Sequence, residues 1–241
     1  MPRSTAKPPD DQPPAIYLPF TDKTLKFLRG LKKNNNKPWF EEHRGDYDAF
    51  LREPSKSLVE SMAAIFREQR IPLIASAQRS LFRINRDIRF SNDKSPYKTH
   101  IGFSFPVEGT SKEKWCGCYV GFEPKGAGDI EVFVGGGVHQ PMPDQLKALR
   151  KKIAGDHKTL AKLLAEKNFK KEFPSGLKGE SLKRMPIGYE ESHAAADWLR
   201  MKEFMFSSSL TKSELFSEEL PTLLARKFNA AVPVALWFAE A

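Results

Sequence analysis

Residues 81–107 read LFRINRDIRFSNDKSPYKTHIGFSFPV, and apolar side chains occupy every second position at both ends of this stretch. Phe82, Ile84, Ile88 and Phe90 alternate with polar residues before a polar loop at 91–98, and a second alternating run follows over 101–107. A period of two is typical of β-strands with one buried face. We therefore predict two strands, over 81–90 and 101–107. Arg86 is the exception, because it falls on the apolar side.

Two more alternating runs follow, over 115–122 and 129–134, and the second reaches three glycines at 135–137. Connections this short favour an antiparallel meander. One face of the second and third predicted strands is nearly bare, carrying Gly102, Ser104, Gly117 and Gly121 beside Trp115 and Tyr119. If this face coincides with the side that carries Arg83, Asp87 and Arg89, a floor of small residues with a charged rim forms a pocket.

Helical patterns lie on both sides of these strands. Thr21 is a candidate N-cap, and proline opens further helices at Pro38, Pro54 and Pro143. The helix after Pro143 is expected to break at Gly155–Asp156, and terminal helices are expected to be interrupted by Pro233. The predicted fold class is α+β, an antiparallel sheet flanked by N-terminal and C-terminal helices. We expect one domain over residues 20–241 after a disordered, proline-rich tail at 1–19.

The composition is that of a folded, basic protein. The 241 residues are 40% hydrophobic, and 39 Lys and Arg against 30 Asp and Glu leave a net charge of +9, which favours anionic partners. No apolar run approaches the roughly 18 residues of a membrane span, and no apolar signal core is present at the N-terminus. We expect a cytoplasmic protein in which Cys116 and Cys118 are buried, reduced thiols.

The segment 79–100 is the candidate functional site, because it gathers six cations against only Asp87 and Asp93. Guanidinium forks and lysine ammonium groups bind phosphate and carboxylate. We predict that Asp87 orients these groups or a metal, and that Tyr97 or His100 transfers protons. The predicted anion-binding residues are Arg83, Arg86, Arg89, Lys94 and Lys98.

Other interpretations of this segment stay open. The arginines can instead form a structural network with the acidic residues, in which case they hold the fold together. A nucleic-acid-binding module is the alternative function, with Tyr97, Trp115 or Tyr119 stacking on bases. The sequence does not distinguish an enzyme from a binding protein, and it identifies no cofactor. It contains no P-loop, G-x-S-x-G or dinucleotide fingerprint, and neither its five histidines nor its C-x-C pair has metal-site spacing.

Four motifs together carry a family resemblance: NNNKPWFEEHRGDY at 34–47, LFRINRDIRFSNDKSPYKTH at 81–100, FVGGGVHQP at 133–141 and LKRMPIGYEESHAAADWLRMKEF at 182–204. With these motifs the chain resembles DUF2461, a family of uncharacterised bacterial and fungal proteins, over roughly residues 20–240. The resemblance implies a single α+β domain of about this length. It implies no particular activity, substrate or cofactor.

Overall fold

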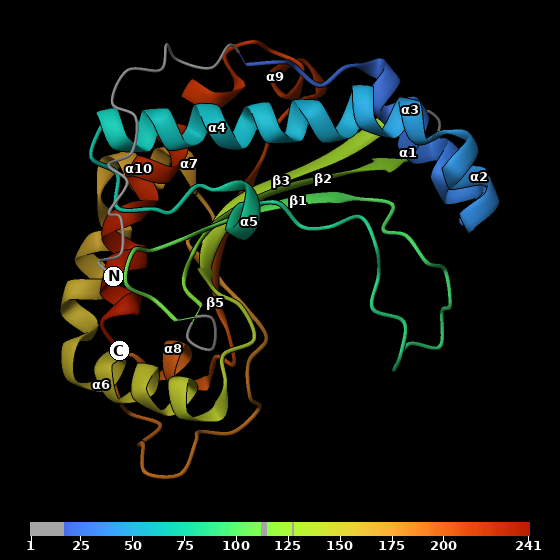
Figure 1. The fold of residues 1–241 in the computed structure, drawn as a ribbon. Coiled ribbons are helices and arrows are strands. Elements are labelled where there is room, and N and C mark those ends of the chain that lie inside the picture. Colours follow the sequence, from blue (N-terminus) through green and yellow to red (C-terminus); the bar gives the residue numbers. More distant parts are fainter. Residues whose placement is uncertain (1–16, 112–114, 127) are drawn as a thin grey trace, which may run out of the picture.

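The computed structural model describes residues 17–111, 115–126 and 128–241, which form an antiparallel sheet packed against helices (Figure 1). The five strands lie in the order β1-β2-β3-β5-β4, with each neighbouring pair antiparallel. This arrangement confirms the predicted α+β class. The strands are β1 (Ile101–Pro106), β2 (Gly117–Lys125), β3 (Asp129–Val138), β4 (Leu177–Lys178) and β5 (Phe204–Ser209).

Helices precede and follow β1–β3 in the chain, as the sequence patterns predict. The first group is α1 (Asp22–Lys33), α2 (Lys37–Glu42), α3 (Arg44–Tyr47), the π-helical turn η1 (Asp48–Arg52), α4 (Glu53–Glu68) and α5 (Ala77–Ser80). The second group is α6 (Pro143–Ala165), α7 (Lys167–Glu172), α8 (Ala196–Arg200), α9 (Lys212–Leu215) and α10 (Leu220–Ala239). Thr21 occupies the N-cap position of α1, and α6 is kinked at Asp156, as expected.

The π-helical turn η1 has a cause in the sequence. Proline has no backbone N–H, so Pro54 cannot donate to the carbonyl of Phe50 four residues earlier. The Thr24 hydroxyl donates to that carbonyl instead, at 2.7 Å. The carbonyl of Asp48 accepts from the Glu53 N–H, which is five residues later. The wider turn therefore joins α3 to α4 while the Phe50 carbonyl keeps a hydrogen-bond donor.

One face of the sheet forms the main core with the helices. Phe103 and Phe105 of β1 are fully buried. They lie in aromatic contact with Phe20, which precedes α1, and with Phe66 of α4 and Phe228 of α10. Cys118 is on the same face, and Cys116 donates its S–H to the Ala235 carbonyl. Both thiols are buried, as predicted, and burial raises the pKa of Cys116 to about 12. We call this side of the sheet the covered face.

The strand predicted over residues 81–90 does not form. Only Leu81 pairs with Phe103 in β1, after which the segment leaves the sheet and folds back on itself, with Asn85 paired to Tyr97. Arg86 explains the departure, because burying its guanidinium on the apolar side would be costly. Instead it donates to Asp93, to the Ser95 carbonyl and to the Ser91 hydroxyl, which holds the segment as a protruding loop.

Three other expectations need correction. Strand β3 continues through Gly135–Gly137 to Val138, and a side chain does not fit at these positions, because the backbone of β5 lies against Gly135 and Gly137 and that of β2 against Gly136. Strands β4 and β5 lie in the C-terminal part of the chain, where helices were expected. Helix α10 runs through Pro233 without interruption. Pro233 and Asn229 are exposed, so water can bond the carbonyl that the proline leaves unpaired.

The predicted boundary between tail and domain can be compared with the structure only from residue 17 onward. Residues 1–16 of the predicted tail lie outside the described residues, whereas the Leu18 N–H donates to the Ser57 hydroxyl of α4 at 2.8 Å. Within the described ranges, no helix combines the length and apolar character needed to cross a membrane.

Candidate functional site

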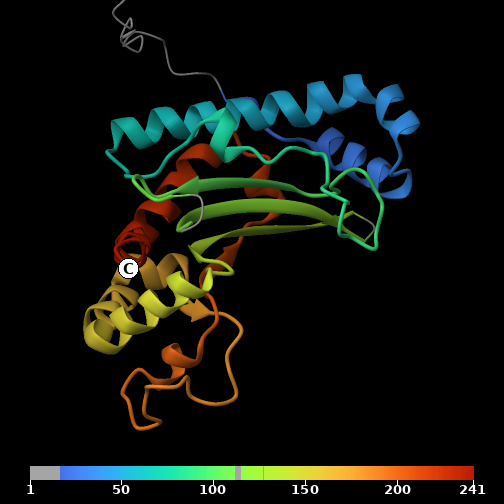
Figure 2. The same ribbon diagram turned by 60° about the horizontal axis from the view of Figure 1, so that its bottom comes forward.

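The face of β1–β3 opposite the helical core is built from glycine, serine and aromatic residues. In the observed register Gly102 lies opposite Gly121, Ser104 opposite Tyr119, and Tyr119 opposite Gly135. Helices α1, α4 and α10 lie on the other side, and none of the described helices covers this side of the three strands (Figure 2). The shared face predicted for these glycines with Ser104 and Tyr119 is confirmed. We call it the open face.

Glycine on the open face makes room for the Tyr119 ring. A Cβ atom on Gly121 would lie 2.6 Å from the Tyr119 hydroxyl oxygen, and one on Gly102 would lie 2.9 Å from the ring carbon Cζ. Both distances are shorter than real side chains allow. The ring therefore lies flat across two strands, half-buried, and its burial raises the pKa of the Tyr119 hydroxyl.

Tyr119 is the centre of a line of three rings that we call the aromatic row. The centroids of Phe82 and Tyr119 are 6.2 Å apart, and those of Tyr119 and Phe133 are 5.9 Å apart. Phe82 keeps 45% of its surface exposed, and Phe133 is half-buried. Trp115 lies on the same face and donates its indole N–H to the Ser104 hydroxyl at 2.9 Å. The open face thus presents partly exposed rings.

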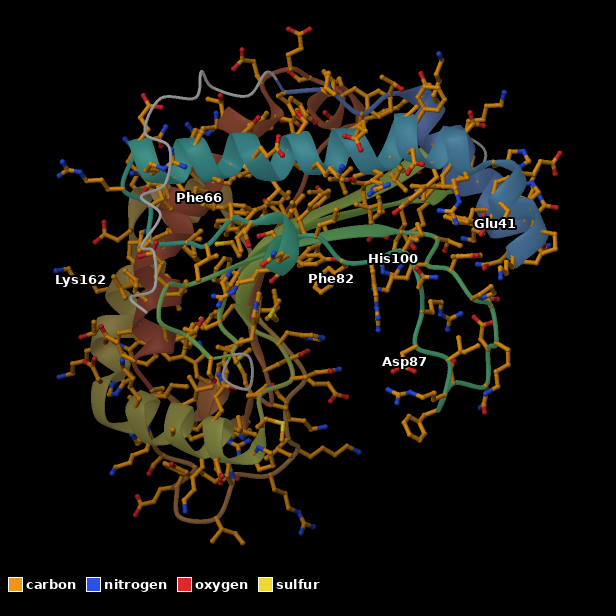
Figure 3. All side chains as sticks on the ribbon, in the orientation of Figure 1. Glu41, Phe66, Phe82, Asp87, His100 and Lys162 are labelled. Atoms are coloured by element: carbon orange, nitrogen blue, oxygen red, sulfur yellow. The ribbon has the colours of Figure 1, made fainter. Side chains whose placement is uncertain are left out.

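Phe82, and not Arg83, joins the open face, so the expected alignment of Arg83, Asp87 and Arg89 with the glycines is wrong. The Phe82 N–H bonds the Gly102 carbonyl beside Tyr119, whereas Arg83 lies toward η1 and α4. Asp87 and Arg89 belong to the protruding loop, and Figure 3 shows Asp87 on the part that extends away from the sheet. The misalignment follows from the missing strand, since a loop does not keep the two-residue period.

The first motif holds the base of this loop. The Asn35 side chain bonds the Tyr97 backbone twice, accepting from its N–H at 3.0 Å and donating to its carbonyl at 2.9 Å. The Phe40 ring stacks on the Tyr97 ring, with centroids 4.2 Å apart. Tyr97 is only 6% exposed. Asn35 was not predicted as a site residue. The only signal in the sequence is its place in the asparagine run at 34–36, which opens the first motif.

Three of the five predicted anion-binding residues are engaged within the loop. Arg86 makes the network described above, and Arg89 forms a two-pronged pair with Asp87 at 2.9 and 2.6 Å. Lys94 donates to the Ile88 carbonyl at 3.1 Å. Hydrogen bonds from Ser95, followed by Arg86, lower the pKa of Asp93 to about 2. These contacts are what the structural interpretation of the segment predicts.

Lys98 and Arg83 are different, because neither forms an ion pair with a carboxylate anywhere in the described chain. The Lys98 ammonium lies 5.2 Å from the centre of the Phe82 ring, at the end of the aromatic row. Partial burial lowers the pKa of Lys98, and the nearby Arg83 guanidinium lowers it further. A half-buried ammonium that lacks a counter-ion is a candidate anion ligand.

His100 borders the same end of the open face (Figure 3). His100 is exposed to solvent. Burial by the surrounding chain lowers the pKa of His100, the Lys98 ammonium acts in the same direction, and the Glu123 carboxylate opposes them. The imidazole therefore favours its neutral form at neutral pH, in which it can accept a proton. Asp87 has its pKa lowered, chiefly by its hydrogen bond from Arg89, so it is a weak base.

No group of three or more His, Cys, Asp or Glu side chains suited to hold a metal ion occurs in the described ranges. His139 near the glycine run pairs with Glu203 instead, at 2.8 Å. Phe82 and Phe133 were not predicted as site residues, because their partnership with Tyr119 depends on strand register.

Comparison with known proteins supports one relationship. Neither the curated proteins nor the solved structures include a match to the chain. The family described as conserved hypothetical protein (DUF2461) matches residues 23–237, which include all four motifs that carried the resemblance. The match covers most of the 241 residues. The chain therefore belongs to the DUF2461 family.

Proposed function

We propose that the open face binds a phosphorylated or otherwise anionic small molecule that carries a flat ring, of which a nucleotide is the simplest example. The proposal rests mainly on the position of Lys98. Its ammonium lies at the end of the aromatic row without a carboxylate partner among the described residues. An anionic group near Lys98 and a ring over Phe82 or Tyr119 would be bound together, which neither feature would achieve alone.

Electrostatics supports the anionic half of this ligand. Partial burial and the nearby Arg83 charge both disfavour the protonated form of Lys98, as the lowered pKa shows. A bound anion reverses both penalties, because it supplies the missing counter-charge in a region partly shielded from water. Lysine acts as a point charge toward phosphate, so the geometry around Lys98 needs no rigid fork.

The aromatic row supports the ring half. Stacking of one base on an aromatic side chain is worth roughly 1–3 kcal/mol and tolerates any flat ring. The two spacings of 6.2 and 5.9 Å place the three rings next to one another, with neighbouring rings tilted by 46° and 56°. Gly102 and Gly121 leave room for the Tyr119 ring against the sheet.

The remaining predicted residues have supporting positions in this proposal. Arg86, Arg89 and Lys94 shape the loop beside the site, since each already bonds within it. His100 is the best-placed group for proton transfer, because it borders Lys98 and is partly exposed. The buried Tyr97 and the outlying Asp87 are less well placed to reach a ligand on the open face.

A titration with a fluorescent nucleoside monophosphate at low salt tests the proposal. We expect Lys98→Gln to weaken binding about tenfold, since a charge-assisted contact contributes roughly 1.5–3 kcal/mol. Lys162→Gln is the matched control, because Lys162 is exposed on α6, far from Phe82 and His100 (Figure 3). Equal affinities of the two variants, or no binding to the wild type, would refute the proposed site.

Single-stranded nucleic acid is the second candidate ligand, favoured because none of the described helices covers this side of strands β1–β3 (Figure 2). An open surface admits a chain of nucleotides, and three rings in line can stack on successive bases. The test is an oligonucleotide titration over a salt series. Binding that falls steeply with salt and exceeds that of the mononucleotide supports a polymer, whereas equal affinities favour the small molecule.

A further inference from the structure

A second feature borders the open face at residues 81–83, where Phe82 of the aromatic row also contributes to the lining of a cavity. There, the chain leaving α5 and the start of β1 face η1 and α4 across a cavity of about 250 Å³. Its walls combine three cations with an apolar base and one buried hydroxyl. We propose that this cavity binds a small organic anion, a carboxylate or phosphate monoester with a short apolar body. The proposal does not depend on the function proposed for the open face.

Cations come from both walls of the cavity. Arg52 and Lys56 are four residues apart and share one side of the helix, while Arg83 lines the cavity from the opposite wall. Arg52 pairs with Asp48 at 3.0 Å and Lys56 with Glu53 at 2.8 Å, both at the surface. Exposed pairs of this kind contribute little, so a bound anion can take over these contacts at small cost.

Ser55 provides an independent sign of a missing ligand. This residue lines the cavity, is 1% exposed, and its hydroxyl has no hydrogen-bond partner among the described residues. A buried hydroxyl is normally paired, because losing its bonds to water without replacement is costly. A ligand oxygen in the cavity would supply the partner. Ser55 differs in this respect from Ser57, which accepts the Leu18 N–H.

The π-helical turn places these groups together. Arg52 is the last residue of η1, and Ser55 and Lys56 lie in the first turn of α4. A π-helical turn adds one residue to a helical circuit, and such turns occur frequently at functional sites. Here it rotates the start of α4 relative to α3, so that Arg52, Ser55 and Lys56 line the same cavity as Tyr47.

The base of the cavity defines the rest of the ligand. Leu51, Leu81 and Ile101 are apolar and contribute to its lining. A cavity of about 250 Å³ is smaller than the roughly 300–1,000 Å³ of sites for drug-sized ligands. Its occupant is therefore a short molecule with one anionic end. Inorganic phosphate alone would leave the apolar base unfilled.

Calorimetric titration at low salt with phenyl phosphate, inorganic phosphate and phenol tests this assignment. We expect phenyl phosphate to bind more tightly than either fragment, since only it carries both the anion and the apolar body. Ser55→Ala should weaken phenyl phosphate binding about tenfold, the typical effect of losing a buried hydrogen bond to a charged group. The same change should leave thermal stability without ligand unchanged or raised, because it removes an unpaired buried hydroxyl.

Ser57→Ala is the matched control in the same helix. It removes a paired hydroxyl, so it should lower the melting temperature and leave the phenyl phosphate affinity unchanged. Lys56→Gln with Arg83→Gln should weaken binding further, whereas Lys98→Gln should not. Absence of phenyl phosphate binding, an unchanged affinity of Ser55→Ala, or a loss confined to Lys98→Gln would each overturn the assignment. The last result would place the ligand on the open face.

Discussion

The two faces of strands β1–β3 are formed by alternate residues of the same chain segments, yet they differ in almost every physical property. On the covered face, Phe103 and Phe105 are fully buried against other phenylalanines, Phe20 and Phe66. On the open face, the neighbouring positions are Gly102 and Ser104, and the exposed surface comes from the rings of the aromatic row. Residue by residue, each strand therefore alternates between stabilising the fold and presenting a surface.

This difference separates stability from function in a way that substitutions can test. Side chains on the covered face fill the core, so removing them leaves cavities. Side chains on the open face lie on glycine, so removing them mainly exposes backbone. If the open face binds a ligand, its substitutions should affect affinity more than stability, and those on the covered face should do the reverse.

The largest expected effect is the loss of a covered ring. Phe103→Ala should lower the free energy of unfolding by about 3–5 kcal/mol, because it creates a cavity in a fully buried site. Tyr119→Ala, on the half-buried open face, should cost only about 1–2 kcal/mol. Urea denaturation measures both. Equal losses would mean that the two faces contribute alike to the core.

A smaller loss of stability is expected at the glycines. Substitutions there distinguish a glycine that lies against backbone, Gly137, from one that lies against a side chain, Gly102. Gly137 has a positive φ of 114°, and a Cβ atom there would overlap the Phe204 carbonyl of β5. Gly137→Ala should therefore cost about 1–3 kcal/mol of stability, measured by denaturation. Gly102→Ala should cost less, because only the Tyr119 ring is in the way and it can rotate. A larger loss at Gly102 would contradict the role of that ring.

The next smaller effect is expected where Asn35 anchors the loop, and it should be confined to that part of the chain. Asn35→Ala removes two hydrogen bonds to the Tyr97 backbone, each worth about 0.5–1.5 kcal/mol. Hydrogen exchange should show lost protection at the amides of Tyr97 and Lys98, with little change in β2 and β3. The control is Asn34→Ala, since the Asn34 side chain bonds only the Gly30 carbonyl. Unchanged protection at Tyr97 and Lys98 would show that the loop does not depend on the first motif.

The smallest effect expected is a pH dependence. The pKa of His100 is lowered below its usual 6.5, so the unfolded chain takes up a proton before the folded one. The stability contributed by neutral His100 is complete above pH 6.5 and decreases as the pH falls below it. His100→Gln should remove that part of the slope. An NMR titration in which the His100 pKa lies above 6.5 would reverse the sign of this prediction.

The parts of the fold that could be predicted are those set by local pattern. Thr21, Pro54 and Asp156 mark helix starts and a kink correctly, and the runs at 101–107, 115–122 and 129–134 are strands within a few residues. These features depend on neighbours in the chain, such as a missing N–H at proline. Periodicity also placed Gly102, Ser104 and Tyr119 on one face correctly.

The parts that were wrong depend on contacts between distant segments. Residues 81–90 alternate like a strand, but Arg86 bonds Asp93 and Ser95 instead of entering the core. Strand β5 is short, and its pairing with the glycines of β3 is invisible in the local pattern. For the same reason the aromatic row was missed. Phe82, Tyr119 and Phe133 are far apart in sequence, and only the register brings their rings together.

The most direct test of the open face as a binding surface is NMR of its aromatic side chains during a titration with adenosine monophosphate at low salt. The rings of Phe82, Tyr119 and Phe133 should shift together and saturate with one affinity, which Lys98→Gln weakens. The rings of Phe103 and Phe105, on the covered face of β1, should not shift. Unchanged signals from the aromatic row at saturating ligand, or shifts confined to other rings, would contradict the account.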